Sequence, residues 1–124
     1  MAKLPNEAES PVFDLNLSTV SNEAYRHVID TTIRSQLVMM ALEPNEDIGP
    51  EIHEEHDQFI YIVIGKGILT LNEKEFDLYP GIGFIVAAGV EHNVLASNLG
   101  IKLFTIYSPP EHEESTYQLI KNES

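Results

Sequence analysis

The sequence predicts an all-β fold, a sandwich or a small barrel, and three observations support that prediction. Short apolar runs of about five to eight residues recur at near-regular spacing along the chain. These runs are rich in β-branched and aromatic residues, which suit a pleated, buried surface. Turn residues separate them, and little of the chain has a convincing helical pattern.

The first half of the chain predicts a loose arm followed by three strands. Residues 1–11 are polar, contain two prolines and predict a flexible N-terminal arm. The segment VFDLN, residues 12–16, favours an edge strand. Within residues 21–30, the part RHVID alternates as a strand does. SQLVMMALE, residues 35–43, predicts a strand that ends at the turn residues PNEDIGP.

The second half predicts a series of strands and turns. QFIYIVI suits a buried strand, and GKG, residues 65–67, predicts a turn after it. ILTLN and KEFDLY predict a hairpin around Asn72 and Glu73, and Pro80 with Gly81 marks the next turn. IGFIVA, HNVLAS and IKLFTIY predict further strands, separated by AGVE and NLG. The barrel is thus expected over residues 12–112, with a polar C-terminal tail over residues 113–124.

Composition limits the classes of function. The 124 residues are the size of one domain, and 20 Asp and Glu against 7 Lys and Arg give a net charge of -13. Such a surface repels phosphate backbones and anionic lipids, so neither nucleic acid nor a membrane is expected as a partner. The absence of cysteine excludes disulfides and thiolate metal sites. Without an apolar signal core at the N-terminus, we expect a cytoplasmic protein. No phosphate-binding loop or nucleophile motif is present.

Four potential metal ligands stand at the ends of predicted strands. Because side chains alternate along a strand, Glu51 and His53 share one face. Gln58 and His92 each open a later strand and face the same way as apolar core residues. Two imidazoles, a carboxylate and an amide suit one divalent ion such as Zn, Mn, Fe, Ni or Co, with two octahedral positions left for water or a small molecule. The alternative is that these polar groups only satisfy buried hydrogen bonds.

The spacing of these residues resembles the cupin pattern. The first cupin motif, G-x5-H-x-H-x3,4-E-x6-G, aligns Gly65, Gln58, His53 and Glu51, with Asn45 at the opening glycine. The second motif, G-x5-P-x-G-x2-H-x3-N, aligns Gly81, Gly89 and His92, with Ala87 in place of the proline and Ala96 in place of the asparagine. A subgroup of short cupins is more similar still, with its Glu-x-His and Asp-Gln-Phe segments and a TIYSPPEH-like ending. The resemblance covers roughly residues 25–112.

The resemblance implies a fold and a range of functions. The fold would be a cupin-type double-stranded β-helix, a jelly-roll barrel in a single domain. The donor set resembles that of mannose-6-phosphate isomerases, so an isomerase-like or oxygenase-like metalloenzyme acting on a small polar or sugar-like molecule is one hypothesis. The alternatives are a non-catalytic metal- or small-molecule-binding cupin and a structural one. Small cupins also imply a homodimer formed through edge strands, with Val12 to Leu17 as one such strand.

Further residues are expected at the rim and on the walls of the pocket around the metal ligands. His56 and Tyr107 are the candidate catalytic groups, and the expected pocket walls are Ile60, Ile62, Val94 and Leu103. His112 is expected either to cap the pocket or to lie in a surface tail, and His27 is expected to be structural. Glu54, Glu55, Asp57 and the acidic stretch from Glu111 to Glu123 are expected to be solvated.

Overall fold

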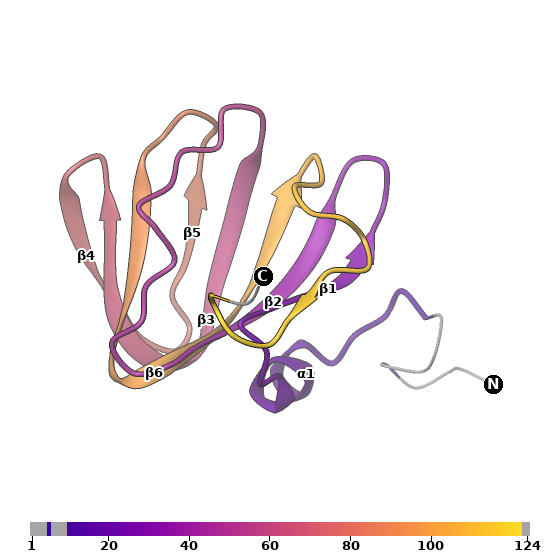
Figure 1. Cartoon of the computed structure of the whole chain (residues 1–124), viewed down its shortest axis with the longest axis horizontal. Coiled ribbons are helices and arrows are strands. Elements are labelled where there is room, and N and C mark those ends of the chain that lie inside the picture. The colour runs from indigo at the N-terminus through magenta and orange to yellow at the C-terminus, as the bar shows by residue number, and fades with distance from the viewer. Residues whose placement is uncertain (1–4, 6–9, 123–124) are drawn as a thin grey trace.

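The computed structural model describes residue 5 and residues 10–122, and within them seven strands form one antiparallel sheet (Figure 1). The strand order is β4-β3-β6-β2-β1-β7, and β5 pairs with β3. The strands are β1 Arg26–Thr31, β2 Gln36–Leu42, β3 Asp57–Leu71, β4 Lys74–Leu78, β5 Gly83–Val86, β6 His92–Ser108 and β7 Tyr117–Gln118. The predicted all-β fold is confirmed: the sheet curls on itself as a jelly-roll barrel.

The two longest strands, β3 and β6, build both halves of the barrel. Gln58 lies opposite Tyr107 in one half, and Leu71 lies opposite His92 in the other. The register between the strands shifts twice over residues 62–67. Because β-bulges bend a strand and increase its twist, β3 crosses from one half of the barrel to the other without ending.

The turns predicted at GKG and NLG are therefore wrong, because GKG lies inside β3 and NLG lies inside β6. Gly65 has a φ of 96°, and a Cβ built on it would lie 2.1 Å from the carbonyl oxygen of Gly100. Gly100 has a φ of 73°, and its Cβ would lie 2.7 Å from the carbonyl oxygen of Leu42. These glycines allow two backbones to approach closely where the sheet bends.

Other local predictions are confirmed. Asn72 and Glu73 form the two-residue turn of the β3–β4 hairpin with φ values of 43° and 72°, as a hairpin turn of the primed type requires. RHVID and most of SQLVMMALE form β1 and β2. Residues 80–81 form a turn before β5.

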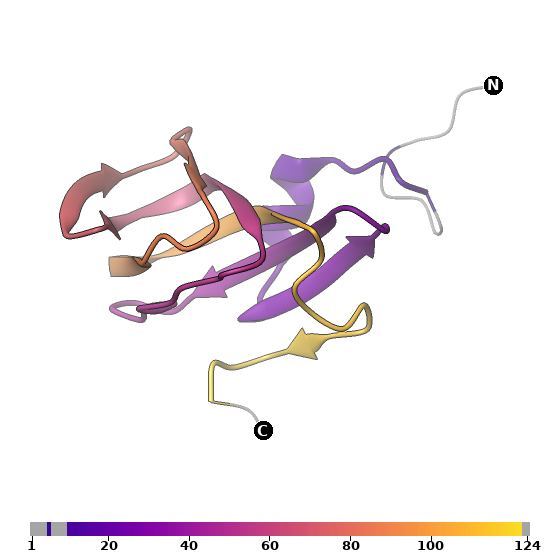
Figure 2. The same ribbon diagram turned by 90° about the horizontal axis from the view of Figure 1, so that it is seen from above.

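The strand expected over residues 12–16 is wrong, because a helix, α1 Leu15–Ser21, begins there. The Asp14 carboxylate accepts a hydrogen bond of 3.0 Å from the Leu17 amide and caps the helix. Figure 2 shows α1 beside the sheet, with the preceding chain leading away from it. Most of the predicted arm over residues 1–11 lies outside the described residues. No helix in the described part of the chain is long and apolar enough to cross a membrane.

The core lies inside the curled sheet. Strand alternation turns one face of each strand inward, and the four predicted wall residues are all in this core at 0–1% exposure: Ile60, Ile62, Val94 and Leu103. The C-terminal segment then folds back along the barrel, since β7 pairs with β1 and the Tyr25 amide donates to the Leu119 carbonyl oxygen. The barrel thus offers a rigid, dry interior to any polar group placed at its end.

Candidate metal centre

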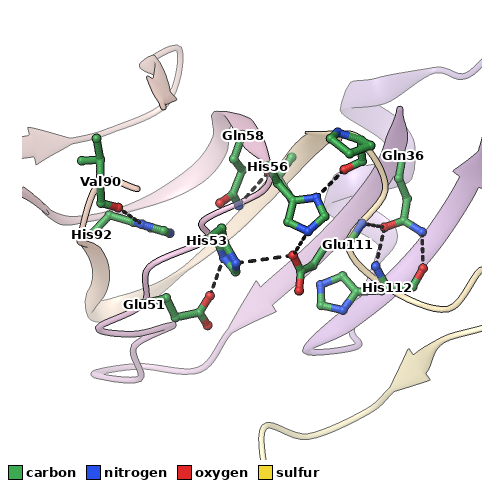
Figure 3. A network of polar contacts seen from close by, with 11 residues as sticks. Gln36, Glu51, His53, His56, Gln58, Val90, His92, Glu111 and His112 are labelled. Carbon is green, nitrogen blue, oxygen red and sulfur yellow. Dashed lines mark hydrogen bonds and ion pairs between the residues drawn. The ribbon is translucent and has the colours of Figure 1, made fainter. Parts of the chain in front are cut away.

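Backbone hydrogen bonds hold the two ligand-bearing segments together. Glu51 and His92 form an isolated antiparallel bridge, in which each amide donates to the other's carbonyl oxygen over 2.9 and 3.0 Å. The Gly89 amide donates to the His53 carbonyl oxygen over 2.9 Å. The loop before β3 is thus fixed against the start of β6. Figure 3 shows the side chains of Glu51, His53 and His92 that these segments carry.

The predicted ligands meet at one point inside the barrel end. Glu51, His53 and His92 each present a ligand atom, and these three atoms all lie within 4.8 Å of one another. Two atoms bound at about 2.1 Å to one ion can be at most about 4.2 Å apart, so small side-chain rotations would complete the geometry. Gln58 is the second residue of β3, lies next to His53 in Figure 3, and is 3% exposed.

Three buried polar atoms of this site have no hydrogen-bond partner among the described residues. They are His53 Nε2, Gln58 Oε1 and His92 Nε2. His53 Nε2 lies 2.8 Å from Glu51 Oε2, but the contact lacks hydrogen-bond geometry, so it is a close approach rather than a hydrogen bond. An unpaired buried polar group costs about 1–3 kcal/mol. Atoms of these types are metal ligands, so the residues present fit a divalent ion.

In His92 and Gln58, the other polar atom of the side chain makes a hydrogen bond, and this bond orients the unpaired atom toward the site. His92 Nδ1 donates to the Val90 carbonyl oxygen over 3.1 Å, so its Nε2 carries the free lone pair. Gln58 Nε2 donates to Thr105 Oγ1 over 3.0 Å, and that hydroxyl donates to the Phe59 carbonyl oxygen over 2.9 Å. Thr105 therefore fixes the amide with its oxygen toward the histidines. Thr105, a lone hydroxyl in an apolar strand, was not predicted as part of the site.

A carboxylate from the C-terminal segment supports the histidines. Glu111 Oε2 lies 3.5 Å from His53 Nδ1 and 2.7 Å from His56 Nε2. His56 Nδ1 lies 2.8 Å from the carbonyl oxygen of Pro109, which can only accept, so this nitrogen carries a proton. His56 thus donates to the Pro109 carbonyl oxygen through Nδ1 and faces the Glu111 carboxylate through Nε2. Carboxylates behind metal-binding imidazoles orient the ring in this way.

The expectation that Glu111 is part of a solvated end is wrong. The residue follows Pro109 and Pro110, which stiffen the chain directly after β6 and return it over the barrel end. The signal that could have found it is a Glu-His pair after two prolines at the end of the last long strand.

Gln36 holds the segment that carries Glu111. This glutamine is 1% exposed, and its Oε1 accepts hydrogen bonds from the amides of Glu111 and His112 over 3.2 and 3.0 Å. Its Nε2 donates to the His112 carbonyl oxygen over 2.7 Å and to Thr31 Oγ1 over 3.0 Å. Both ends of the amide are thus satisfied, in contrast to Gln58. Gln36 was not predicted as part of the site, and its signal in the sequence is a single amide at the start of an apolar strand.

Tyr107 and His112 line the same end of the barrel. Tyr107 is 2% exposed, and its ring centroid lies 5.8 Å from the ring centroid of His53. Burial raises the pKa of Tyr107 far above its usual value of 10. The phenol therefore keeps its proton at neutral pH and can donate it in a hydrogen bond. The His112 ring lies 5.2 Å from Tyr107, and burial, aided by the positive charge of Arg26, lowers the pKa of His112 to about 4. Of its two expected places, His112 takes the one at the pocket.

The other candidates lie at the rim or away from the site. Glu54, Glu55 and Asp57 are exposed as expected, and Asp57 Oδ1 also accepts a 3.0 Å hydrogen bond from the Ala88 amide. His27 packs edge-on against Tyr117 with ring centroids 4.9 Å apart, and burial lowers its pKa.

Comparison with known proteins gives a consistent family assignment. A family model described as a cupin domain matches residues 38–107. The uncharacterized protein L612 of Acanthamoeba polyphaga mimivirus is 40% identical over 114 residues, which are 88% of this chain and 71% of that protein. The uncharacterized protein YrkC of Bacillus subtilis is 36% identical over 112 residues, which are 85% of this chain and 60% of that protein. This chain thus spans less than two thirds of YrkC.

A solved structure is similar over nearly the whole chain. The crystal structure of BH2720 from Bacillus halodurans superimposes with a TM-score of 0.85 at 28% sequence identity, covering 93% of each chain. Its similarity extends beyond the residues that the family model matches.

Proposed function

The chain belongs to the cupin family, and on that premise we propose that it is a metalloprotein with one divalent ion in its barrel. The proposed ligands are Glu51, His53, Gln58 and His92. The observation that carries the proposal is the set of three buried, unpaired atoms on three of these residues. The donor set, with no sulfur and one carboxylate, suits Zn, Mn, Fe, Ni or Co.

The residues around the proposed ion favour a reaction that moves a proton on a small polar molecule. When bound, the ion would polarise an oxygen atom of that molecule as a Lewis acid. The Tyr107 hydroxyl can donate a hydrogen bond to a developing negative charge, because burial keeps it protonated. The pair His56 and Glu111, 2.7 Å apart beside His53, can hold a proton close to the centre. We therefore favour an isomerase-like activity over an oxygenase-like one.

Metal content tests the binding part of the proposal. We expect protein purified under native conditions, or refilled with zinc or manganese, to hold close to one ion per chain by elemental analysis. His53→Ala combined with His92→Ala should reduce this below about a tenth of an ion while circular dichroism still reports a β-rich fold. His27→Ala is the matched control, since His27 packs on Tyr117 away from the ligands. An empty wild type, or a double variant that keeps its ion, would refute the site.

Activity assays separate an enzyme from a binding protein. Metal-loaded wild type and His56→Gln would be screened by NMR for solvent deuterium exchange into small hydroxy carbonyl compounds, since a moved proton is replaced by deuterium. Exchange that depends on both the ion and His56 supports the isomerase-like reaction. An absence of exchange across the panel would leave a metal-binding module without this chemistry.

We also propose that two copies of the chain form a homodimer through the outer face of the sheet. Leu37, Ile106, Phe59 and Ile85 lie opposite one another in one row across β2, β6, β3 and β5. Ile85 is 70% exposed and Phe59 is 36% exposed. The segment Pro11 to Leu15 lines a surface groove together with Leu37 and Ile106, so it extends this apolar face. Helix α1 replaces the expected edge strand, which moves the proposed contact from an edge to a face. Light scattering at micromolar concentration should report twice the mass of one chain, and a monomer would contradict it.

A further inference from the structure

One basic side chain of the described residues points into the barrel. Arg26 lies on the same face of β1 as Val28, which is 6% exposed and belongs to the core. Its guanidinium carbon lies 5.2 Å from the centre of the Tyr25 ring. Burial is the main cause of the raised pKa of Tyr107 and the lowered pKa of His112, and the charge of Arg26 acts on both groups. Because β1 pairs with β2, and β2 pairs with β6, which carries Tyr107, the inward face of Arg26 belongs to the same barrel interior as Tyr107.

The charge of Arg26 has no counter-ion among the described residues. Its Nη1 donates to Gln118 Oε1 over 2.9 Å, and this neutral amide is its one hydrogen-bond partner there. Its Nε is buried and unpaired, and none of the described carboxylates lies within 4.0 Å of the guanidinium. Arg26 as a whole is half-buried, and removing even part of a cation from water without an anion to pair it carries a cost. The free edge of this guanidinium is thus suited to an anion that comes from outside the chain.

His112 adds a second unpaired group on the same wall. Its Nε2 is buried without a partner, and its ring lies against Tyr107, which in turn lies against His53. Figure 3 shows the ring next to Glu111 and turned toward the proposed ligands, while Gln36 holds the backbone of His112 from behind. Six buried side-chain atoms of the described residues are unpaired. Three belong to the proposed ligands His53, Gln58 and His92, and two others are Arg26 Nε and His112 Nε2. The atoms on Arg26 and His112 are not accounted for by the proposed ion.

We propose that Arg26 and His112 form a carboxylate-binding subsite, so that the ligand of this protein is a small organic acid. The carboxylate lies at Arg26, and another oxygen of the same molecule reaches the metal centre. Binding of the carboxylate at Arg26 does not require a metal ion, whereas the contact between the ligand and the metal rests on the proposed function. Hydroxy and oxo acids of a few carbon atoms have this arrangement of oxygens.

A carboxylate fits this subsite better than a phosphate does. One guanidinium offers two parallel N–H groups, which match the two oxygens of a carboxylate. A phosphate carries more charge, and the described chain supplies no second cation for it. Arg34, Lys66 and Lys74 are exposed, Lys102 donates to the Val20 carbonyl oxygen, and Lys121 pairs with Asp47. With a net charge of -13, the rest of the protein would repel a dianion more strongly than a monoanion.

The subsite is tested with defined probes on metal-free, nitrogen-15-labelled protein. Glycolate, neutral ethylene glycol and inorganic phosphate would be titrated at about 0.15 M salt, which screens the field of distant surface charges. The readout is the Arg26 Nε–H resonance, identified as the arginine side-chain resonance that remains in Arg34→Gln, since the chain has two arginines. We expect this resonance to shift with glycolate and not with ethylene glycol. Arg26→Gln should weaken glycolate binding by about tenfold or more, and Arg34→Gln should leave it unchanged.

Three results would overturn the subsite. The first is a glycolate affinity that is equal in wild type and Arg26→Gln, and the second is an Arg26 resonance that stays in place while glycolate binds. The third is phosphate binding tighter than glycolate, which would replace the carboxylate class. Because the resonance is read in the wild type, the test survives if a variant folds poorly.

A zinc-loaded sample separates this inference from the proposed function. Zinc should strengthen the binding of glycolate more than that of acetate, which lacks the hydroxyl. Equal effects on both would refute the link between the subsite and the ion. If the protein takes up no zinc but binds glycolate through Arg26, the proposed function is refuted and the subsite is supported. If the protein takes up zinc but its glycolate affinity does not depend on Arg26, the subsite is refuted and the proposed function is supported.

Discussion

Replacing Gln58 with leucine should separate metal binding from folding. In the metal-free protein, Gln58→Leu removes the hydrogen bond to Thr105, at a cost of about 1 kcal/mol, while Thr105 keeps its bond to the Phe59 carbonyl oxygen. The change also removes the unpaired Oε1, which recovers about 1–3 kcal/mol. The free energy of unfolding of the metal-free variant should therefore be unchanged or raised by up to about 2 kcal/mol.

The effect on metal binding can be expressed as a thermal shift. At a free zinc concentration of about 100 times Kd, the wild type gains about 2.7 kcal/mol. For 124 residues the unfolding entropy is roughly 0.26 kcal/mol per degree, so this gain raises Tm by about 10 °C. A tenfold loss of affinity in Gln58→Leu would leave about 1.4 kcal/mol, or about 5 °C, at the same zinc concentration. Differential scanning calorimetry with and without zinc measures both quantities.

Gln36 supplies the matched control, because it is an equally buried glutamine with both ends hydrogen-bonded. Gln36→Leu leaves the amides of Glu111 and His112 unpaired and should lower the free energy of unfolding by roughly 3–5 kcal/mol. The reasoning is refuted if Gln58→Leu destabilises the metal-free protein as much as Gln36→Leu does. It is also refuted if the zinc-induced rise in Tm is the same in Gln58→Leu as in the wild type.

The remaining predictions concern the sheet bend, the outer face and pH. Gly65→Ala should lower the free energy of unfolding, measured by chemical denaturation, by several kcal/mol more than Gly81→Ala does. Both glycines have φ near 97°, but a Cβ at Gly81 meets nothing within 4 Å, so only Gly65→Ala adds a clash. Equal losses of stability would contradict the close approach of the two backbones at Gly65. Ile85→Lys should convert the proposed dimer to a monomer in light scattering while circular dichroism still reports a β-rich fold, and an unchanged dimer would exclude this face. Because the pKa of His112 is about 4 in the folded chain and near 6.5 when unfolded, the unfolded state binds the proton first as pH falls. Stability should therefore fall between pH 6.5 and 4, and the slope should be shallower in His112→Gln; identical slopes would refute the assignment.

The sequence predicted those parts of the fold that depend on local pattern. RHVID and SQLVMMALE alternate or carry β-branched residues, and they form strands. The hairpin at Asn72 and Glu73 follows from residues that tolerate, or are forced into, a positive φ between two strands. These signals are contained within a few neighbouring residues, so no knowledge of the partner strand was needed.

The errors at the two glycines arose where a distant partner decides the local structure, and the error at residues 12–16 arose from a missed helix cap. Gly65 and Gly100 are turn signals in a single sequence, but the two backbones pass so closely that the glycines serve the crossing of β3 and β6. VFDLN alternates like a strand, but Asp14 caps a helix that packs against the sheet. At the two glycines the pairing that decides the structure lies elsewhere in the chain, whereas the Asp14 cap is a local signal, three residues from the Leu17 amide.

The candidate site shows the same division. The structure brings the predicted residues Glu51, His53 and His92 together, because the strand ends that carry them are set by motif spacing. Glu111 and Gln36 were not predicted as site residues, because their roles depend on where the C-terminal segment returns over the barrel. That path is set by tertiary packing and has no periodic signature.

The central claim is that one divalent ion binds where the unpaired atoms of His53, Gln58 and His92 meet Glu51. Crystals grown with zinc and measured on both sides of the zinc absorption edge test it most directly. The account predicts one anomalous peak per chain at this point, about 2.0–2.2 Å from each of the four side chains. Fully formed crystals with no peak there, or with a peak bound by other residues, would contradict it.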